Sequence, residues 1–454
     1  MKRIIATAIL AFSWLLSAGQ DKDFYHIVVT PGEDASTSVT INYHTNHLYS
    51  YIQYADVLDI SCTRYQFIKP VCELWSTKDI ENTSTSSSFY TNDRFVCHAT
   101  ITDLQPGRKY EFWICCSASG YFAYAEGSGS TASRTGSHVE AFHPEVDSET
   151  CYFTTASNSK EWNFVAFTDF QSVPNSITHQ LIRNMKEIGN NPPLMVCSGD
   201  MVDVAGWEDS WTWLLDNDAF RDFVYASSPG DHAYWADAKD RKYPQYTEAH
   251  TFNHLFHFPQ NGAEKSKNTS YFFYYNNALF VSLDMNNSNI SRGEKFDDQA
   301  RWFQHTLDSL KGTYQYLIVL MHKSVYGSSI IDSNVGKYIR PQWSPIFQKY
   351  NVDLVLSGHD HVYSRTYQLD GDHKSTIKNK GTYYLDMGSS GNKRRAVDTS
   401  LSESDGIHAK VIDLKTKELS FAANIQVSKK KMIVTVYNQH KQIADQFTIK
   451  AKRR

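Results

Sequence analysis

The sequence predicts an all-β sandwich followed by an α/β domain. Over residues 21–156, β-branched and aromatic residues fall in short alternating runs, which is typical of half-buried strands. From Trp162 onward, apolar strands alternate with helical segments, which is typical of a sheet covered by helices. A chain of 454 residues is also too long for one ordinary core, so a division into domains is expected.

The all-β part is expected to contain strands at residues 38–43, 95–101 and 110–114, with residues 151–155 as its last strand. Clusters of Gly, Asn and Ser separate these runs, as in a β-sandwich. A Ser-rich stretch at residues 83–88 and a Gly/Ser run at residues 127–137 interrupt the pattern as long insertions.

The α/β part is expected to contain buried strands at residues 163–167, 194–197, 278–283, 316–321 and 352–356. Ile177, Leu181, Met185 and Ile188 lie at near-helical spacing, as do Phe303, Leu307 and Leu310, which predicts two amphipathic helices over the sheet. Residues 410–450 return to alternating strands that either complete a second sheet or form a small appended one.

The amino terminus has the layout of a secretory signal peptide. Lys2 and Arg3 precede an apolar run of 13 residues at positions 4–16, and small residues follow up to Gly19. The run is short for a membrane-spanning helix, which needs about 20 residues. We therefore expect residues 1–19 to be removed, no membrane span afterwards, and a secreted, periplasmic or cell-surface protein.

The distribution of cysteines agrees with export, and the distribution of charge argues against nucleic acid binding as the main task. Of the 7 cysteines, only Cys197 lies outside the first third of the chain, which predicts at least one disulfide, with the pairing open; the alternative is that most are buried free thiols. The formal net charge of −4 is spread over the chain without a long basic face. No feature of the sequence sets an oligomeric state.

Polar turns follow most of the predicted α/β strands. Residues 278–283 are the exception, and one further turn lies between strands. Because ligands bind at the carboxyl ends of strands in open α/β sheets, these turns are expected to converge. The turns are Asp169-Phe170-Gln171, Gly199-Asp200, Pro229-Gly230-Asp231-His232, His322 and Gly358-His359-Asp360-His361.

Carboxylates and imidazoles are the usual donors for hard and borderline metal ions, and an Asp can bridge two of them. Two ions about 3.5 to 4 Å apart can clamp a phosphate and activate water. The turns therefore predict a two-metal phosphoesterase site.

In this order, the motifs resemble those of the metallophosphoesterase (calcineurin-like) superfamily, and most closely its purple acid phosphatase-like branch. The family pattern is D-x-H or D-x-G, G-D-x-x, G-N-H, V-x-x-H and G-H-x-H. The sequence Gly388-Ser389-Ser390-Gly391 resembles a loop downstream in that branch, and the sequence from Leu104 to Tyr110 resembles the tyrosine corner of a fibronectin type III domain.

The resemblance implies a four-layer α/β/β/α metallophosphoesterase sandwich preceded by an all-β fibronectin III-like sandwich. The expected divisions are a signal peptide at residues 1–19, the β-sandwich at 21–156, the catalytic domain at 160–405 and an associated β segment at 406–454.

The resemblance also implies a role for each motif residue. Asp200 would bridge two metal ions, identified only as Fe, Zn or Mn, and His232 would face the substrate phosphate as a proton donor or an electrostatic anchor. The remaining ligands would be Asp169 and His361 on the first ion and Asp231, His322 and His359 on the second.

The sequence departs from the family pattern at three positions. Asp203 replaces the Tyr whose phenolate gives purple acid phosphatases their colour, so we expect a protein that is not purple. Gln171 stands where His is usual, and is either a metal ligand through its carbonyl oxygen or a hydrogen-bonding neighbour of the ligands. Asp231 replaces the family Asn, which keeps three carboxylates at the site. Asp203 itself is expected to be a structural carboxylate next to the metal ligands, and metal ligation by Asp203 is the less favoured alternative.

Two further groups of residues have competing interpretations. Residues 323–340 lack the additional active-site His of some relatives, so Lys323, Tyr326 or Arg340 would hold the phosphate or are ordinary loop residues. His250, His254 and His257 would form a separate metal site on a helix, or would pack among neighbouring aromatic residues.

The sequence therefore predicts an exported dinuclear-metal enzyme that hydrolyses small phosphorylated substrates, most of all phosphomonoesters, by metal-bound hydroxide. The alternatives are a phosphodiesterase or nucleotide hydrolase, or a catalytically weak exported phosphate-binding or adhesion protein. Residues 207–258 and 326–341 are expected to be the loops that shape the pocket.

Overall fold

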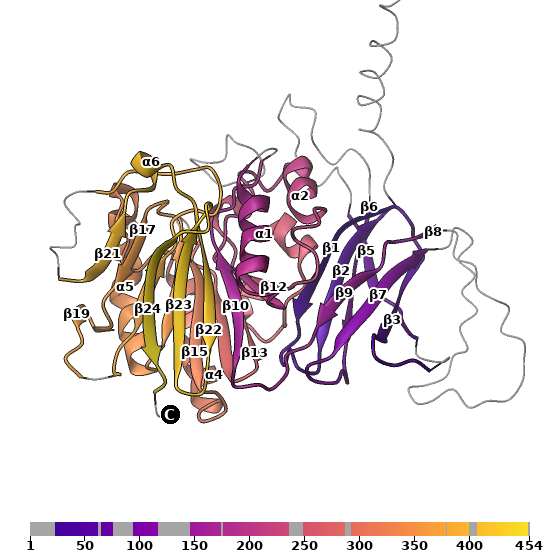
Figure 1. The fold of residues 1–454 in the computed structure, drawn as a ribbon, viewed down its shortest axis with the longest axis horizontal. Helices are drawn as coiled ribbons and strands as arrows, with labels where there is room; N and C mark the ends of the chain where they lie inside the picture. Colours follow the sequence, from indigo (N-terminus) through magenta and orange to yellow (C-terminus); the bar gives the residue numbers. More distant parts are fainter. Residues whose placement is uncertain are drawn as a thin grey trace, which may run out of the picture.

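The computed structural model describes residues 23–61, 65–75, 94–116, 146–173, 176–235, 248–286, 292–377, 379–398 and 406–452. The described part of the chain is elongated, with a β-sandwich at one end and stacked α/β layers at the other (Figure 1).

The N-terminal part is a sandwich of two sheets. One sheet contains β1 (Phe24–Pro31), β2 (Val39–Thr45), β5 (Val71–Trp75) and β6 (Arg94–Ile101), and the other contains β3 (Ser50–Asp56), β4 (Gln66–Ile68), β7 (Lys109–Cys116), β8 (Val146–Asp147) and β9 (Cys151–Thr154). All four strands expected here are present. The backbone N–H of Gln105 donates to Tyr110 Oη at 2.9 Å, which is the hydrogen bond expected of a tyrosine corner.

The first sheet of the sandwich continues into the α/β part without a break. β1 pairs in parallel with β12 (Val224–Ser227), with Val29 opposite Val224. One 10-stranded sheet results, in the order β24-β23-β22-β10-β11-β12-β1-β2-β6-β5. It includes β10 (Trp162–Phe167) and β11 (Leu194–Cys197), as expected, whereas β12 was not predicted. Backbone hydrogen bonds therefore tie the sandwich to the strands that carry the site.

A second, 7-stranded sheet packs against the first. It contains β13 (Tyr271–Tyr275), β14 (Ala278–Leu283), β15 (Tyr316–Lys323), β16 (Leu354–Gly358), β20 (Tyr383–Asp386), β17 (Tyr363–Thr366) and β21 (His408–Ile412). The ring centroids of Phe164 in β10 and Phe280 in β14 are 5.3 Å apart, and both side chains are fully buried between the sheets. A two-layer β core is thus formed.

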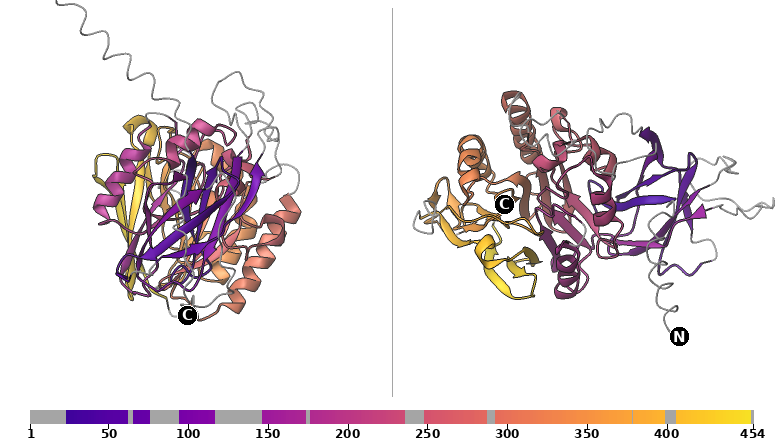
Figure 2. Two further views of the ribbon diagram at one scale, coloured as in Figure 1. Left: turned by 90° about the vertical axis from the view of Figure 1, so that its right-hand side faces the viewer. Right: turned by 90° about the horizontal axis from the view of Figure 1, so that it is seen from above.

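Helices cover both outer faces of the paired sheets (Figure 2). On the side of the first sheet lie α1 (Thr178–Ile188), which packs on β22, and α2 (Glu208–Leu215). The second sheet is covered by α4 (Arg292–Ser309) and α5 (Ile330–Lys349), whose apolar side chains form one cluster with it. The predicted four-layer α/β/β/α sandwich is confirmed.

The C-terminal strands complete the first sheet. β22 (Phe421–Val427) pairs antiparallel with β10, and β23 (Lys431–Asn438) and β24 (Ile443–Lys450) follow at the edge. Residues 410–450 were expected to complete a second sheet or to form a small appended one. β21 does join the second sheet, but β22, β23 and β24 extend the first sheet instead.

One expected loop is largely a helix. Residues 326–341 were expected to shape the pocket, yet α5 begins at Ile330 and includes Pro341 and Pro345. A proline removes a helix hydrogen bond and argues against a helix in sequence reasoning. Burial of Trp343 and Phe347 against Phe303 of α4 stabilises the helix despite these prolines.

The predicted disulfide is present. Cys72 in β5 and Cys97 in β6 are bonded, and the free cysteines of the described residues are Cys115, Cys116, Cys151 and Cys197. Cys62 lies outside the described residues, as do residues 1–19, on which the expectation of a signal peptide rests. No helix in the described ranges is both long and apolar enough to cross a membrane.

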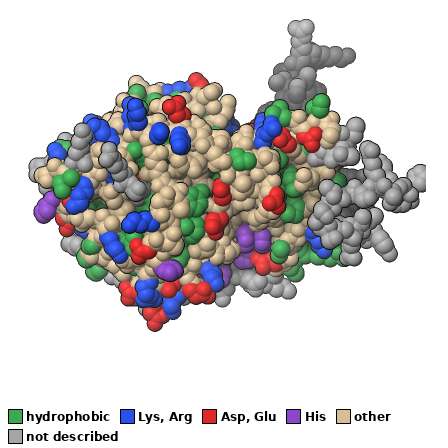
Figure 3. All heavy atoms as spheres, turned by 90° about the horizontal axis from the view of Figure 1, so that it is seen from below, with side chains coloured by type: hydrophobic (Ala, Val, Ile, Leu, Met, Phe, Trp, Pro, Cys, Tyr) green, Lys and Arg blue, Asp and Glu red, His purple; other side chains and the backbone are tan. Residues whose placement is uncertain are grey.

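Histidine and aromatic side chains pack where the sandwich meets the α/β layers. His254 of α3 (His250–Leu255) stacks on Trp75 with centroids 4.7 Å apart, and His257 stacks on His98 at 3.8 Å. His254 and His257 thus pack against aromatic rings, which agrees with the packing interpretation given for the group His250, His254 and His257. Figure 3 shows histidine side chains side by side on the surface near the middle of the long axis.

Candidate metal centre

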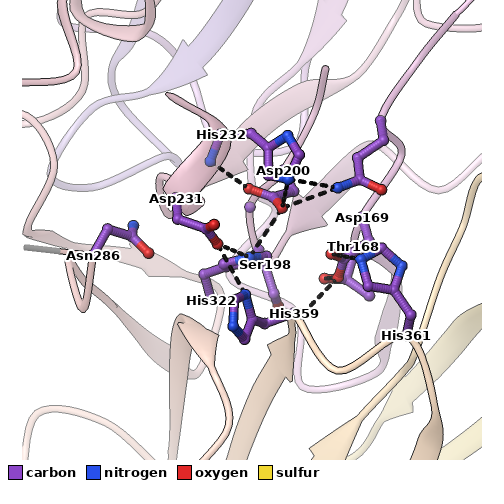
Figure 4. A network of polar contacts seen from close by, with 12 residues as sticks. Thr168, Asp169, Ser198, Asp200, Asp231, His232, Asn286, His322, His359 and His361 are labelled. Atoms are coloured by element: carbon purple, nitrogen blue, oxygen red, sulfur yellow. Dashed lines mark hydrogen bonds and ion pairs between the residues drawn. The ribbon is translucent and has the colours of Figure 1, made fainter. Parts of the chain in front are cut away.

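The ends of several strands bring carboxylates and imidazoles together, as the turn pattern predicted (Figure 4). β10, β11 and β12 of the first sheet are followed by Asp169, Asp200 and Asp231. The second sheet supplies His322 at the end of β15, and His359 and His361 after β16. The site is therefore assembled across the two packed sheets.

The residues expected to hold the second ion form a tight group. Asp231 Oδ1 lies 2.9 Å from His359 Nδ1 and 3.1 Å from His322 Nε2. One ligand atom from each of the three residues lies within 4.8 Å of the others. The side chains of Asp231 and His359 are 21% and 12% exposed, so this group faces the opening of the site.

The group expected around the first ion is more deeply buried. Asp169 and Asp200 offer atoms within 4.8 Å of each other and of His322, which was expected on the second ion, while the expected His361 places Nε2 3.4 Å from Asp169 Oδ1. Asp200 also forms a group with Asp231 and His232. Asp200 is thus shared between both halves of the site, as a bridging carboxylate must be.

Hydrogen bonds orient the imidazoles and one carboxylate. His322 Nδ1 lies 2.8 Å from Ser198 O, and His361 Nδ1 lies 3.1 Å from Lys393 O. A carbonyl oxygen only accepts, so each Nδ1 carries the proton and each Nε2 keeps its lone pair for a metal ion. Asp169 Oδ2 accepts from Thr168 Oγ1 at 2.7 Å and from the His359 N–H at 2.9 Å, which leaves Oδ1 facing the site.

The backbone of this site lies in a strained conformation. Five predicted site residues have positive φ angles, although none is glycine. A cluster of such residues is typical of functional sites, where the surrounding structure holds the strain. The angles are 45° for Asp169, 37° for Gln171, 51° for Asp200, 72° for His359 and 53° for His361.

Two glycines allow the turns to approach each other. A Cβ atom on Gly230 would lie 1.8 Å from Asp200 Oδ1, and one on Gly358 would lie 2.0 Å from Asp169 Oδ2. Any side chain at these positions would displace a carboxylate of the site. The Gly of the G-D-H and G-H-D-H turns is therefore a steric requirement.

The Gly388-Ser389-Ser390-Gly391 loop braces the first turn. Ser390 N donates to Thr168 O at 2.8 Å, and Ser389 Oγ donates to Asp169 O at 3.3 Å. A Cβ on Gly391 would lie 2.0 Å from Phe170 O. The downstream loop singled out in the sequence thus supports Asp169 from behind.

The donor set fits bound cations. Asp169 Oδ1, Gln171 Oε1 and His322 Nε2 are buried and have no hydrogen-bond partner. Unsatisfied buried polar atoms are costly, and Asp169 and His322 lie close enough together to share an ion. Burial, opposed by the charge of His322 and aided by that of Asp200, raises the pKa of Asp169 to about 7, so a cation at this place would favour the ionised form of Asp169.

Gln171 and Asp203 occupy different places. Gln171 Nε2 donates to Asp200 Oδ2 at 3.3 Å and lies 3.0 Å from His232 Nε2, while its carbonyl oxygen stays available as a ligand. The Asp203 carboxylate instead lies 3.4 Å from His232 Nδ1 and 3.6 Å from Lys393 Nζ. Asp203 is therefore a neighbour of His232. From the sequence, Asp203 was likewise expected to lie next to the metal ligands and not to be one of them.

His232 is held with one nitrogen toward the site. Its Nδ1 lies 2.5 Å from Asp203 O, its backbone N–H donates to Asp200 Oδ1 at 3.1 Å, and its ring packs on Trp235 with centroids 3.6 Å apart. Nε2 is left facing Asp200 Oδ2 at 3.4 Å.

Tyr326 and Arg340, two of the residues considered for phosphate binding, are engaged elsewhere. Tyr326 Oη donates to Asp372 Oδ1 at 2.5 Å, and Arg340 Nε donates to Val325 O at 3.1 Å. Lys323 ends β15 with a largely buried side chain. Sequence reasoning missed a different cation, Lys393, whose Nζ lies 3.4 Å from His232 Nε2.

Sequence reasoning also missed a polar network that directly follows β14. Residues 278–283 were predicted to be the one strand without a polar turn after it, and this prediction was wrong. Asn286 Nδ2 donates to Pro229 O at 2.5 Å. Lys295 Nζ donates to Asp284 Oδ2 at 2.6 Å, and Tyr234 Oη donates to the same carboxylate. The polar residues directly after β14 were the available signal. The network anchors both sides of the turn that carries Asp231 and His232.

Comparison with known proteins agrees with this geometry. A family model described as calcineurin-like phosphoesterase matches residues 163–363. A model described as purple acid phosphatase, N-terminal domain, matches residues 24–140. The chain thus contains a calcineurin-like phosphoesterase domain and a purple acid phosphatase N-terminal domain. The fibronectin type III resemblance of that first domain stays a prediction.

Curated relatives match this chain over short stretches. An uncharacterized protein of Mycobacterium tuberculosis is 33% identical over 82 residues, which are 18% of this chain and 16% of the relative. The purple acid phosphatase of Glycine max is 31% identical over 116 residues, 25% of this chain and 24% of the relative. The chain thus spans less than a quarter of the length of these relatives.

Two solved structures share the fold. The purple acid phosphatase PPD1 from yellow lupin (Lupinus luteus) has a TM-score of 0.68 at 14% identity, covering 94% of this chain and 74% of that one. PhoD has a TM-score of 0.57 at 12% identity, covering 95% of this chain and 94% of that one.

Proposed function

We propose that this chain is an exported dinuclear-metal phosphoesterase that hydrolyses phosphomonoesters. The observation that carries the proposal is the position of Asp200, whose carboxylate is grouped with Asp169 on one side of the site and with Asp231 on the other. Two ions sharing one carboxylate form the arrangement that suits phosphate ester hydrolysis. The phosphatases among the relatives support the reaction class.

When bound, ions such as Fe, Zn or Mn would supply Lewis acidity toward phosphate oxygens and activate water near neutral pH. Asp169, Gln171, Asp200 and His361 would hold one ion, and Asp231, His322 and His359 would hold the other with the shared Asp200. The buried unpartnered atoms Asp169 Oδ1, Gln171 Oε1 and His322 Nε2 support this assignment.

His232 is suited to act on the substrate. Asp203 O fixes the position of Nδ1, and the ring of Trp235 fixes the plane of the imidazole. Nε2 therefore already points into the site, and the side chain needs no change of rotamer. A fixed imidazole beside the reacting group can hold or transfer a proton at the leaving oxygen. Its buried side chain, 4% exposed, also keeps bulk water from this atom.

Export is supported by two independent features. The composition of residues 1–19 has the order of a signal peptide. The Cys72–Cys97 disulfide fits an oxidising compartment, since structural disulfides are rare in the cytosol.

The proposal is tested by hydrolysis of nitrophenyl phosphate and bis(nitrophenyl) phosphate with residues 20–454, with the metals quantified on the same sample. A monoester preference with about two metals per chain is expected. A diester preference would favour a phosphodiesterase or nucleotide hydrolase. A fully metal-loaded protein that is inactive toward both esters would refute the proposed enzymatic activity and would favour the alternative of a phosphate-binding or adhesion protein.

A further inference from the structure

Lys393 brings a cation to the side of the site where His232 lies. Its Nζ is 3.4 Å from His232 Nε2 and 3.6 Å from Asp203 Oδ1, and its side chain is 33% exposed. Lys393 is separated from His232 by 161 positions in sequence, so the fold alone creates this contact.

The backbone of Lys393 is fixed to the metal-binding turns. Its carbonyl oxygen accepts from His361 Nδ1 at 3.1 Å. Two residues later, Arg395 N donates to His361 O at 3.0 Å and Arg395 Nη1 donates to His359 O at 2.9 Å. The origin of the Lys393 side chain is therefore set by the same histidines that face the metal ions.

The neighbouring cations of this segment have protein partners. Arg395 is bonded to His359 O, and Arg394 Nη2 donates to Ser420 Oγ at 2.9 Å. Within the part of the chain that the structure describes, Lys393 Nζ instead has long polar contacts, 3.4 Å to His232 Nε2 and 3.6 Å to Asp203 Oδ1. An ammonium group with such weak contacts can turn toward an incoming anion while giving up little interaction energy with the protein.

Asp203 explains why the lysine stays near His232. Its carboxylate lies within 3.6 Å of both His232 Nδ1 and Lys393 Nζ, so it can hold the lysine at the edge of the site when no anion is present. Asp203 stands where purple acid phosphatases carry the metal-binding Tyr, so the exchange places a carboxylate where it can pair with a lysine.

We propose that Lys393 binds a non-bridging phosphate oxygen of the substrate, with Asp203 as its positioning residue, and thereby favours dianionic phosphomonoesters over monoanionic diesters. This inference rests on the proposed phosphoesterase function. A charge-assisted hydrogen bond is roughly twice as strong as a neutral one, and an additional cation favours the more highly charged ligand.

The test compares wild type with Lys393→Met, Lys393→Arg and Lys417→Met, the last an exposed lysine of α6 (Leu414–Lys417) outside the site. For each metal-loaded protein, the Kd for inorganic phosphate is measured by calorimetry. KM and kcat are measured with nitrophenyl phosphate and bis(nitrophenyl) phosphate, and metals are quantified to show that the site is intact.

Lys393→Met is expected to weaken phosphate binding and raise KM for the monoester by about 10- to 100-fold, with metal content retained and the diester changed less than about threefold. Lys393→Arg should recover most of the binding, and Lys417→Met should match wild type. Asp203→Asn should weaken phosphate binding in wild type but add little in the Lys393→Met background.

Unchanged phosphate binding in a metal-loaded Lys393→Met protein would overturn the proposal, and equal losses on both esters would overturn its specificity claim. Failure of the phosphoesterase function is recognised separately, because metal-loaded wild type would then hydrolyse neither ester. Phosphate calorimetry would still report on Lys393 in that case.

Discussion

His322 Nδ1 lies 2.8 Å from the carbonyl oxygen of Ser198, and this hydrogen bond joins the two central sheets at the metal centre. Ser198 follows β11 of the first sheet, whereas His322 lies in β15 of the second. The tautomer that exposes Nε2 to a metal ion is thus fixed by a residue of the opposite sheet. Metal binding should therefore be linked to the packing of the sheets.

Asp200→Asn is expected to abolish binding of both metals and the stabilisation that they provide. The substitution removes the shared charge and leaves an amide beside His322 Nε2, which lies 3.2 Å from Asp200 Oδ2. Bound metal at 100 times its Kd stabilises a fold by about 2.7 kcal/mol, so wild type should melt higher with metal and the variant should not.

The measurement is metal content by mass spectrometry together with melting temperature in chelator and in excess Mn²⁺ or Zn²⁺. Asp218→Asn, whose side chain is 86% exposed, is the matched control and should behave as wild type. Equal metal content and activity in wild type and Asp200→Asn would refute the bridging assignment.

Asp231→Asn is expected to change metal preference while retaining part of the activity. Asp231 Oδ1 contacts both His359 and His322, and an Asn oxygen can keep these positions without the negative charge. A lower ligand charge favours ions of lower charge, so the ratio of ferric iron to zinc or manganese bound should fall. The ratio is measured after loading from an equimolar metal mixture, and an unchanged ratio would contradict the charge argument.

Lys295→Met is expected to destabilise the fold by about 3 to 5 kcal/mol, because it leaves a buried carboxylate without its partner. Asp284 is fully buried, and Lys295 is 8% exposed and 2.6 Å away. Asp284→Asn in the same chain should recover much of this loss, since no uncompensated charge remains.

Urea denaturation of both single variants and the double variant measures the coupling. Because Tyr234 also bonds Asp284, the turn bearing His232 should loosen, so activity should fall before the protein unfolds. Additive losses in the double variant would show that the pair does not act as a unit.

The iron-loaded protein is expected to lack the intense long-wavelength band of purple acid phosphatases. The band needs a phenolate ligand, and Asp203 stands at that position with its carboxylate beside His232 and Lys393. An absorption spectrum after loading with iron is sufficient, with metal analysis as the control for occupancy. An intense band near the middle of the visible range would mean that another tyrosine binds the ion.

Sequence reasoning predicted the strands and the turns that carry Asp169, Asp200 and His361 because each lies within a local pattern, an apolar run followed by a polar or Gly-rich turn. It missed α5 because Pro341 and Pro345 argue against a helix, while the burial of Trp343 that outweighs them is a tertiary effect. β12 was missed because only two of its four residues, Val224 and Tyr225, have large apolar or aromatic side chains, whereas Ala226 and Ser227 are small.

Lys393 could not be predicted for a related reason. In the sequence it begins a short basic run after a Gly/Ser loop, which resembles an ordinary solvated segment. Only the return of that loop to His361 and His232 gives the lysine a place at the site. The parallel pairing of β1 with β12, which joins the two domains into one sheet, has no local signature either.

The contact between His98 and His257 should make the joint between the domains sensitive to acid. Burial, and to a smaller extent the neighbouring His98, lowers the pKa of His257 to about 4 from an ordinary value of about 6.5. Burial also lowers the pKa of His98, and the charge of Glu73 opposes this shift. The folded state thus binds fewer protons than the unfolded chain between these two pH values. Stability is fully present above pH 6.5 and is lost as pH falls toward 4.

His257→Phe keeps a stacking ring on His98 but removes the titrating group. The fall in melting temperature between about pH 7 and pH 4.5 is expected to be smaller in this variant by roughly 1 to 3 °C, while His305→Asn, at an exposed position on α4, should follow wild type. Differential scanning calorimetry of the three proteins over this range decides the matter. Parallel curves for wild type and His257→Phe would place the acid-sensitive groups elsewhere in the molecule.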